Sequence, residues 1–216
     1  IDGGSTDKSL KIIKKYEKKI DYWVSEKDNG IYDAFNKGMI VSKGEFIGFI
    51  NSDDIYKKNA LSIISNYIRK NKTVDFIFGS VKKHWGILHG YKPYKIKYSW
   101  GFYSSHSTGF FIKKKAAEKV GFYNIKYKYH ADYDYFYRLI VKNKMKGTST
   151  KKNEVVGIFR RGGFSSKISF WKKLKEEIKI RYDNGQNIFL LILIFSNKFL
   201  RNIDEILKNI IKKWIF

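Results

Sequence analysis

The sequence predicts an α/β protein with a doubly wound, mostly parallel sheet, and three observations support that prediction. Residues 46–50 form an unbroken apolar run between turn formers, which is typical of a strand buried on both faces. Along residues 1–166, short apolar runs alternate with segments of helical spacing. The run also ends on a polar group with two adjacent carboxylates, residues 51–54, and open α/β sheets bind ligands at the carboxyl ends of their strands.

The first expected element is a turn at residues 2–7, whose glycines allow a tight backbone and whose Ser5 or Thr6 caps a helix. Apolar residues that recur every three or four positions predict helices at residues 10–16, 31–41, 60–68, 113–120, 132–141 and 167–182. Short apolar runs predict strands at residues 20–24, 46–50, 76–78, 108–112 and 155–159. Residues 79–105 are rich in aromatic side chains and are expected to form strands and loops along one wall of a cleft.

The composition limits the classes of protein to consider. A chain of 216 residues is long enough for one domain with a sizeable core. Its 44 Lys and Arg against 20 Asp and Glu give a net charge of +24, which favours nucleic acid, anionic lipid or phosphorylated substrates as partners. Because the lysines are spread along the whole chain, charge alone does not choose among these partners. The absence of cysteine excludes disulfides and thiolate metal sites and suits a reducing compartment.

The chain begins on Ile1 in the middle of a motif, and no signal peptide is visible. Ile1 is expected to be the last residue of a strand. We therefore expect an N-terminally truncated sheet that lacks its first strand–helix unit, and a fragment that turns over poorly by itself.

Asp53 and Asp54 allow two interpretations. Two acids at the mouth of a loop suggest a divalent cation held by oxygen ligands. Alternatively, the group is a polar turn that closes the strand, and Asp54 caps the next helix.

The last part of the chain differs in character from the rest. Residues 188–195 are eight apolar residues in a row, too few to span a bilayer, which requires roughly 20. Apolar residues of the segment 203–215 share one helical face, with basic residues on other faces. Such a helix lies on an anionic membrane or packs against the domain or another subunit, and the sequence leaves both alternatives open.

Three motifs carry a resemblance to a known family. They are Asp-Gly-Gly-Ser-Thr-Asp at residues 2–7, Ser-Glu-Lys-Asp-Asn-Gly-Ile-Tyr-Asp-Ala-Phe-Asn-Lys-Gly at residues 25–38, and Phe-Ile-Asn-Ser-Asp-Asp at residues 49–54. In this order and spacing the chain resembles family 2 glycosyltransferases of the GT-A fold, and within them the bacterial branch that assembles surface polysaccharides, including colanic-acid-type transferases. The resemblance covers residues 1–166, which we expect to form the GT-A domain, with residues 167–216 as a basic, amphipathic helical extension.

The resemblance implies an inverting transfer of a hexosyl group from a nucleotide-sugar donor to a glycan or lipid-linked acceptor, with Mn²⁺ or Mg²⁺ as cofactor. It implies that Asp53 and Asn51 hold the metal, although the family often has Asp where this chain has Asn51. Asp132 matches the position of the catalytic base, where the family often reads Glu-Asp and this chain has Ala131 before Asp132.

The resemblance also implies donor-binding residues, which are Asp2, Asp28, Asn29, Gly30, Asp33, Lys37, Ser52 and Asp54. In the family a second Asp often follows the position of Asp2, and Gly3 stands there in this chain. Residues that match family positions near the substrate cleft, or that could add positive charge beside the diphosphate, are His106, Arg160, Arg161, Gly162 and Gly163. Asp134 lies two positions after Asp132 and is expected to point away from it, as a surface or capping group.

The resemblance implies a cytoplasmic enzyme, peripheral on the inner face of the cell membrane if the tail binds lipid. Two alternatives are a basic nucleic-acid-binding protein and a catalytically inactive, membrane-associated scaffold. Nucleic acid is not an expected partner, because the chain shows no recognised nucleic-acid motif. A sugar-nucleotide pyrophosphorylase is a third alternative, which would need a glycine-rich, basic loop after its first strand.

Overall fold

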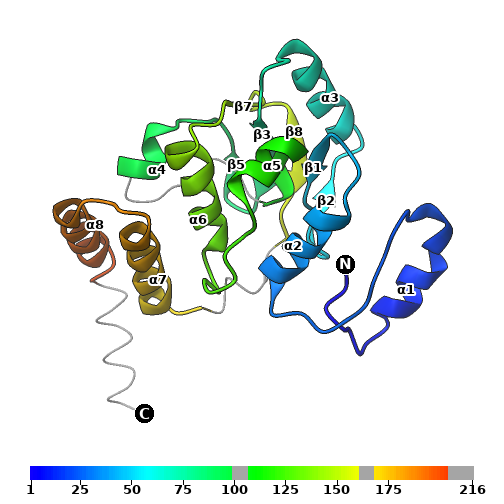
Figure 1. Cartoon of the computed structure of the whole chain (residues 1–216), viewed down its shortest axis with the longest axis horizontal. Coiled ribbons are helices and arrows are strands. Elements are labelled where there is room, and N and C mark those ends of the chain that lie inside the picture. The colour runs from blue at the N-terminus through cyan, green and yellow to red at the C-terminus, as the bar shows by residue number, and fades with distance from the viewer. Residues whose placement is uncertain (99–106, 161–167, 204–216) are drawn as a thin grey trace.

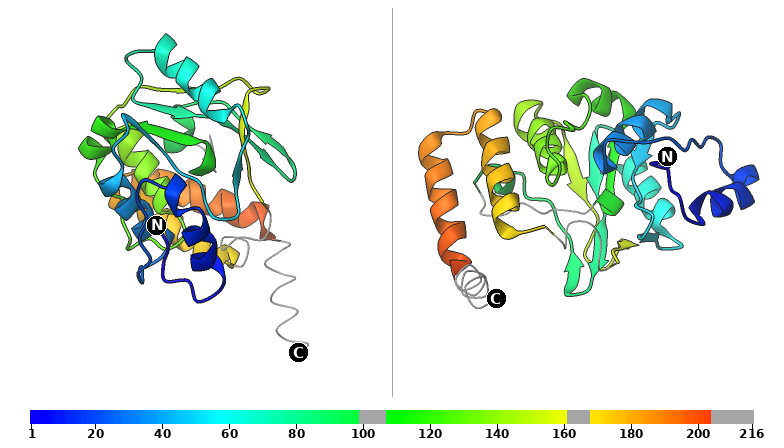
Figure 2. Two further views of the ribbon diagram at one scale, coloured as in Figure 1. Left: turned by 90° about the vertical axis from the view of Figure 1, so that its right-hand side faces the viewer. Right: turned by 90° about the horizontal axis from the view of Figure 1, so that it is seen from below.

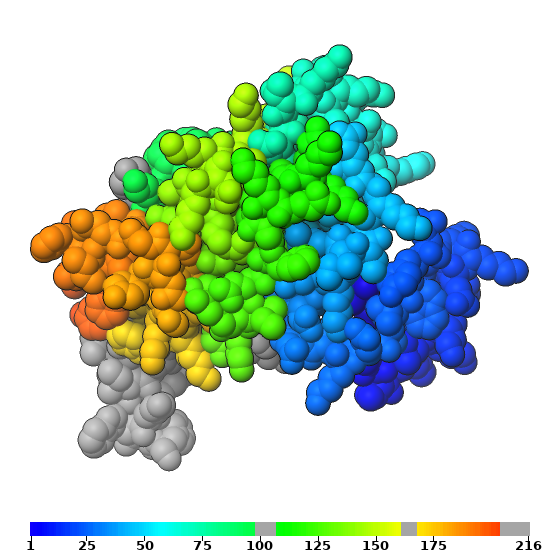
Figure 3. Space-filling model, in the orientation of Figure 1, coloured from blue at the N-terminus to red at the C-terminus, as the bar shows by residue number. Residues whose placement is uncertain are grey.

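The structure is a computed structural model that describes residues 1–98, 107–160 and 168–203. Two small sheets lie at the centre of the molecule, and helices surround them (Figure 1). The N-terminal residues and α1 lie at one end of the molecule, and α7 and α8 lie at the other (Figure 3). None of the helices in the described residues combines the length and the apolar character that crossing a membrane requires.

The first sheet has the strand order β1-β6-β3-β7. Its strands are β1 (Phe46–Gly48), β6 (Phe110–Lys113), β3 (Phe76–Phe78) and β7 (Gly147–Ser149). Strand β6 runs antiparallel to both β1 and β3, and β7 runs parallel to β3. Three of the four strands therefore point the same way, as expected for a mostly parallel sheet.

The second sheet has the order β2-β8-β4-β5 and is mixed. Its strands are β2 (Ile55–Tyr56), β8 (Val155–Ile158), β4 (Ser80–Lys83) and β5 (Gly86–Leu88). Strands β4 and β8 are parallel to each other, and β2 and β5 are antiparallel edge strands. Both sheets receive a strand from residues 76–83, since β3 and β4 follow each other with only Gly79 between them.

The helices of the described residues are α1 (Ser9–Lys15), α2 (Ile31–Val41), α3 (Ala60–Lys70), α4 (Tyr94–Tyr98), α5 (Lys114–Val120), α6 (Ala131–Tyr137), α7 (Phe170–Asp183) and α8 (Ile188–Arg201). Short 3-10 turns lie at η1 (Glu17–Lys19) and η2 (Ser107–Gly109), and a π-helical turn, η3 (Arg138–Lys142), continues α6. Helix α7 lies between α6 and α8 (Figure 2).

Most expected elements are confirmed, and several expectations are wrong in detail. Neither Ser5 nor Thr6 caps α1, whose N-cap is Lys8, and the segment 79–105 contains the short helix α4 besides strands.

Residues 20–24 form no ladder with the described part of the chain. The N–H of Asp2 bonds the carbonyl of Val24 at 2.9 Å, Asp2 and Ser25 form one isolated bridge, and the N–H of Ile20 bonds the carbonyl of Glu17 in the preceding turn at 3.0 Å. The run 46–50 is not buried on both faces, because Ile47 and Phe49 are buried whereas Ile50 is 47% exposed.

The core of the first sheet is aromatic. The rings of Phe76, Phe78 and Phe110 are almost fully buried, and the centroid of Phe110 lies 4.8 Å from that of Phe136 on α6. Tyr123 stacks on Tyr135 of the same helix at 4.1 Å. Aromatic pairs at these separations add to the stabilisation from area burial. They fix α6 against the sheet, and with it the residues at the start of α6.

Candidate active site

Asp54 belongs to the loop that follows β1, and the fold uses its carboxylate. The side chain is only 7% exposed and accepts hydrogen bonds from the hydroxyl of Thr108, the amide of Asn51 at 3.0 Å and the backbone N–H of Arg160 at 3.3 Å. These bonds connect the loop to η2 and to the chain after β8. Asp54 does not cap the next helix, because α3 begins at Ala60 after Asn59.

Asp53 differs from its neighbour. It is half-buried and makes no hydrogen bond or ion pair with the part of the chain that the structure describes. Close by, Asn51 donates from its amide nitrogen to Asp54 and to the hydroxyl of Ser107, both at 3.0 Å, and this turns its carbonyl oxygen Oδ1 away from them. That oxygen is buried without a hydrogen-bond partner. Buried polar atoms are nearly always paired, so this unpaired acceptor, two positions before an unengaged carboxylate in the same loop, fits a bound cation.

The described residues contain no cluster of three or more His, Asp or Glu side chains that could enclose a metal ion. Mg²⁺ and similar cations are commonly held by one or two protein oxygens together with the phosphates of a substrate. The two oxygen ligands offered by Asn51 and Asp53 therefore fit a cation that a diphosphate completes.

Asp132 lies in the first turn of α6, as the sequence predicts. The hydroxyl of Tyr32 on α2 donates to its Oδ1 at 3.2 Å, and the N–H of Tyr133 donates to the same atom at 2.8 Å. Burial raises the pKa of the Asp132 carboxyl above its usual value, although charge on His130 and these two hydrogen bonds oppose the rise. A carboxylate with a raised pKa is a better proton acceptor than an ordinary aspartate.

Lys83, at the end of β4, lies near both the loop after β1 and the start of α6. Its ammonium group is attracted by both Asp54 and Asp132, and burial nevertheless lowers its pKa. It also lies over the ring of Phe159, 4.6 Å from the centroid. Because both carboxylates act on one half-buried cation, the loop after β1 and the start of α6 flank the same part of the molecule.

The carboxylate of Asp2 is fully engaged within the N-terminal motifs. It accepts from the N–H of Gly4 at 3.1 Å, from the N–H and hydroxyl of Ser5 at 2.9 and 2.6 Å, and from the hydroxyl of Ser25 at 2.7 Å. These hydrogen bonds, with that from the Ser5 side chain the strongest, lower the pKa of Asp2 to about 2. Four donors match the roughly four lone-pair sites of a carboxylate. Asp2 thus joins the first turn to the second motif.

The second motif is held together by its own charged residues. Asp28 accepts from the N–H of Gly30 at 2.9 Å, and Asp33 accepts from the N–H of Asn29 at 3.0 Å. Lys37 forms an ion pair with Glu26 at 2.7 Å and lies 3.7 Å from Asp33.

This second motif also approaches the first closely. A Cβ atom at Gly3 would lie 2.4 Å from the carboxylate of Asp28, so any larger residue there would displace that side chain. The predicted donor-binding residues of both motifs therefore form one connected group.

The structure does not test every predicted site residue. His106, Arg161, Gly162 and Gly163 lie outside the described residues. Ser52 is exposed at the tip of the loop after β1, and Arg160 joins the site through its backbone.

The expectation that Asp134 is a surface group is wrong. It is 3% exposed and bonds the guanidinium of Arg138 at 2.9 Å and the amide of Asn184 at 2.8 Å, because α7 packs over this side of α6.

Sequence reasoning missed three residues that shape the site. Lys83 was one cation among 44 Lys and Arg, and nothing in its spacing distinguished it. Tyr32 lies inside the second motif and contacts Asp132 only because α2 packs against the start of α6. Glu176 of α7 accepts backbone N–H bonds from Lys128, Tyr129 and His130 at 2.7–2.8 Å, which fixes the loop before α6.

A family model described as Glycosyl transferase family 2 matches residues 1–131. A PGL/p-HBAD biosynthesis glycosyltransferase of Mycobacterium bovis (strain BCG / Pasteur 1173P2) is 26% identical over 144 residues, which are 62% of this chain and 54% of that protein. An uncharacterized glycosyltransferase of Methanocaldococcus jannaschii is 27% identical over 155 residues, which are 66% of this chain and 53% of that protein. The chain thus spans about half the length of the curated relatives it matches.

Solved structures with the same architecture include S. aureus TarS, with a TM-score of 0.66 at 15% identity over 92% of this chain and 37% of TarS. A form of TarS, residues 1–349, in complex with UDP-GlcNAc has a TM-score of 0.64 at 15% identity and covers 94% of this chain and 62% of that one. The mannosyltransferase PcManGT from Pyrobaculum calidifontis, in complex with GDP-Man and Mn²⁺, has a TM-score of 0.60 at 14% identity over 92% of this chain and 59% of that one. These similarities confirm the predicted fold, and at such identities they show the fold alone.

Proposed function

The chain belongs to glycosyl transferase family 2. From that premise we propose that it transfers a sugar from a nucleotide-sugar donor to a hydroxyl group of a glycan or lipid-linked acceptor. The transfer inverts the anomeric carbon and serves the synthesis of a surface polysaccharide. The names of the similar proteins support the choice of reaction, since one matched structure contains UDP-GlcNAc and another contains GDP-Man and Mn²⁺. The proposal rests on two observations: Asp53 is an unengaged carboxylate next to Asp54 in the loop after β1, and Asp54 and the half-buried Asp132, whose pKa is raised, both act on Lys83.

Asp53 and the Oδ1 atom of Asn51 would hold the Mn²⁺ or Mg²⁺ ion. When bound, such an ion neutralises the diphosphate leaving group and acts as a Lewis acid. Asp54 keeps the loop in place through Thr108 and Asn51, which leaves Asp53 available for this role.

Asp132 acts as general base on the acceptor. Its carboxylate takes the proton of the acceptor hydroxyl while the hydroxyl oxygen forms a bond to the anomeric carbon. The bond from that carbon to the diphosphate oxygen breaks, and the diphosphate leaves with the electron pair. Lys83 supplies positive charge between the two regions, where negative charge moves from acceptor to leaving group.

The N-terminal motifs serve the donor in two ways. Asp28, Asn29, Gly30, Asp33 and Lys37 form the donor-side loop and helix start. Asp2 does not contact the donor itself. Its carboxylate accepts hydrogen bonds from Ser5 and Ser25 and so holds the two motifs in position. We further propose that residues 1–166 carry the transferase domain, that residues 167–216 extend it, and that the enzyme works in the cytoplasm or at the inner face of the cell membrane.

The test is a panel of UDP-, GDP- and dTDP-sugars incubated with the purified protein and Mn²⁺ or Mg²⁺, with release of the nucleoside diphosphate as readout. We expect slow turnover with at least one donor, and loss of turnover when a chelator removes the cation. The proposal is overturned if no donor of the panel is hydrolysed, transferred or bound, or if the Asp53→Ala and Asp132→Asn variants both turn over at the wild-type rate.

A further inference from the structure

Helix α8 exposes an unusually apolar surface. Two of its residues, Leu191 and Ile194, are buried against the rest of the molecule. On its outer side Phe189 is 73% exposed and Leu200 is 64% exposed. Further large apolar side chains exposed on the same helix are Ile188, Ile192, Leu193 and Phe195. An exposed helix face of this kind marks an interaction site.

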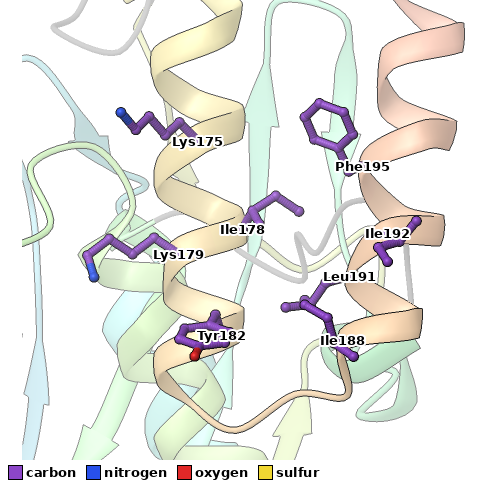
Figure 4. A pocket seen from close by; sticks show the side chains of 8 residues that line it. All are labelled: Lys175, Ile178, Lys179, Tyr182, Ile188, Leu191, Ile192 and Phe195. Carbon is purple, nitrogen blue, oxygen red and sulfur yellow. The ribbon is translucent and has the colours of Figure 1, made fainter.

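A groove runs between α7 and α8. It has a volume of about 430 Å³, and its walls are apolar except for two lysines and one tyrosine of α7. Figure 4 shows Ile178 extending from α7 toward the α8 residues Ile192 and Phe195. Lys175 and Lys179 also line the groove, and their ammonium groups point away from α8. The groove therefore has an apolar floor and a basic edge.

The basic edge is a ridge of three lysines on α7. Lys172, Lys175 and Lys179 follow one another at helical spacing and so share one face of the helix. Lys172 and Lys175 form no ion pair within the described residues, whereas Lys179 pairs with Asp183 at 3.1 Å. Of the acidic residues of α7, only Asp183 contacts the ridge, at Lys179. Glu176 bonds the loop before α6, and Glu177 pairs with Arg181 and Lys198.

We propose that the α7–α8 surface, defined by this lysine ridge and the exposed apolar residues of α8, docks on an anionic lipid bilayer. Exposed apolar side chains beside unpaired cations are complementary to acyl chains beside lipid phosphates. The 14 residues of α8 extend about 21 Å, less than the roughly 30 Å of a hydrocarbon core, so the helix lies in the interface. Trp171, 45% exposed and packed on Phe199 at 5.8 Å, places an indole ring where such rings favour the membrane surface.

Docking would bring the acceptor side of the enzyme to the membrane. Helix α7 holds the loop before α6 through Glu176, and Asp132 lies one turn further on. This step rests on the proposed function, because it assumes that Asp132 faces the acceptor. A lipid-linked acceptor would then reach the base from the same bilayer that holds α7 and α8.

The experiment measures co-sedimentation of the whole chain with two kinds of vesicle, phosphatidylcholine alone and equal parts of phosphatidylcholine and phosphatidylglycerol. We expect binding to the anionic vesicles only. Each lysine near the surface contributes about fivefold in partition, so the double variant Lys172→Ala, Lys175→Ala should bind on the order of 20-fold more weakly. The double variant Phe189→Ser, Leu193→Ser should reduce binding at least as much.

Matched controls lie on the helices α3 and α5, outside the α7–α8 surface. Leu61→Ser removes an apolar residue of α3 that is 67% exposed, and Lys115→Ala with Lys119→Ala removes two exposed lysines of α5. These variants should bind as the wild type does. Equal weakening by controls and test variants would mean that the overall positive charge alone attracts the vesicles, and it would overturn the proposal.

Two further outcomes also decide against the proposal. The first is absence of binding to either vesicle. The second is self-association of the wild type that Phe189→Ser, Leu193→Ser abolishes while vesicle binding persists, which would assign the surface to a second copy. Hydrolysis of soluble nucleotide-sugars is followed in parallel. Vesicle binding without turnover would count against the proposed function alone, and turnover without vesicle binding would count against the docking surface alone.

Discussion

Asp53 and Asp54 are neighbours in the chain, and the fold uses only one of them. Asp54 is buried and accepts from Thr108, Asn51 and the backbone of Arg160, whereas Asp53 has no partner within the described residues. The pair therefore divides into a structural carboxylate and an available one. The interpretation as a polar turn thus fits Asp54, and the cation site stays a prediction for Asp53.

Asp53→Ala should abolish cation-dependent turnover without lowering stability. The variant removes a ligand from the proposed metal site, and we expect donor hydrolysis to fall by about a hundredfold or more. Because the carboxylate makes no contact with the described part of the chain, the midpoint of thermal unfolding should stay within about 2 °C of the wild type. Calorimetry measures the midpoint of unfolding, and release of the nucleoside diphosphate measures donor hydrolysis.

Asp54→Ala is the matched comparison. It leaves the buried hydroxyl of Thr108 and the amide of Asn51 without their acceptor, so we expect a loss of about 3 kcal/mol in the free energy of unfolding. Equal stability of the two variants would contradict the division of roles.

Asp132→Asn should stop transfer while leaving donor binding intact. Loss of a general base costs on the order of 10²–10⁴ in rate. Since burial raises the pKa of Asp132, its charged form is disfavoured in the fold, and the neutral variant should be at least as stable near neutral pH. Titration of the donor and a transfer assay test this. The comparison variant Asp134→Asn breaks a buried ion pair with Arg138 and should instead lose about 3 kcal/mol of stability.

The pH profile should depend on Tyr32. Transfer needs Asp132 deprotonated, so the transfer rate falls as the pH drops through the pKa of Asp132. Because burial raises this pKa, the acidic limb of the pH–rate profile lies at a higher pH than an ordinary aspartate would give. The hydroxyl of Tyr32 lowers this pKa by donating to the carboxylate. Tyr32→Phe should therefore move the acidic limb of the rate profile upward by about half a pH unit. Tyr94→Phe, at an exposed position, is the control, and an unmoved or downward limb in Tyr32→Phe would contradict the assignment.

The order of helices and strands could be predicted from sequence because local patterns specify it. The spacing of apolar residues predicts α2 and β3 with their observed bounds. Strand β7 was missed because Gly147–Ser149 carries no apolar run, and it forms because Gly147 allows the ring of Phe76 to approach. The lateral pairing of strands also escaped prediction, since it depends on contacts between segments that lie far apart in the chain.

The sequence points to the motif residues as site candidates, but it does not show which of them the fold itself engages. Asp2 and Asp53 look alike as acids in turns, yet four donors occupy Asp2 and none occupies Asp53 within the described residues. Such differences arise from neighbours such as Ser25, which the fold supplies. Lys83 shows the converse, because its interaction with both Asp54 and Asp132 arises only when the chain folds.

Lys83→Met should reduce transfer without destabilising the protein. Methionine keeps an unbranched apolar stem over the ring of Phe159 and removes the half-buried charge, whose burial is unfavourable. A charge-assisted contact to a phosphate or to the reacting oxygen contributes about 1.5–3 kcal/mol, which corresponds to a loss of roughly 10- to 100-fold in kcat/KM. Lys82→Met, at the exposed neighbouring position, should have no such effect. Equal kinetics for the two variants would remove Lys83 from the site.

Glu176→Gln should change how stability depends on pH. Burial alone would raise the pKa of Glu176, but hydrogen bonds from His130, Tyr129 and Lys128 outweigh it and hold the pKa below its usual value. A carboxyl with a lowered pKa contributes stability above its unfolded pKa and loses that contribution as pH falls through the folded value. The wild type should therefore lose stability on acidification below about pH 4.5, and Glu176→Gln should show a flatter dependence together with a loss of about 2 kcal/mol near neutral pH. Denaturant titrations at a series of pH values measure both effects. The control Glu118→Gln changes an exposed glutamate of α5 and should keep the wild-type dependence of stability on pH. The same dependence in Glu176→Gln would show that α7 does not secure the loop before Asp132 through this carboxylate.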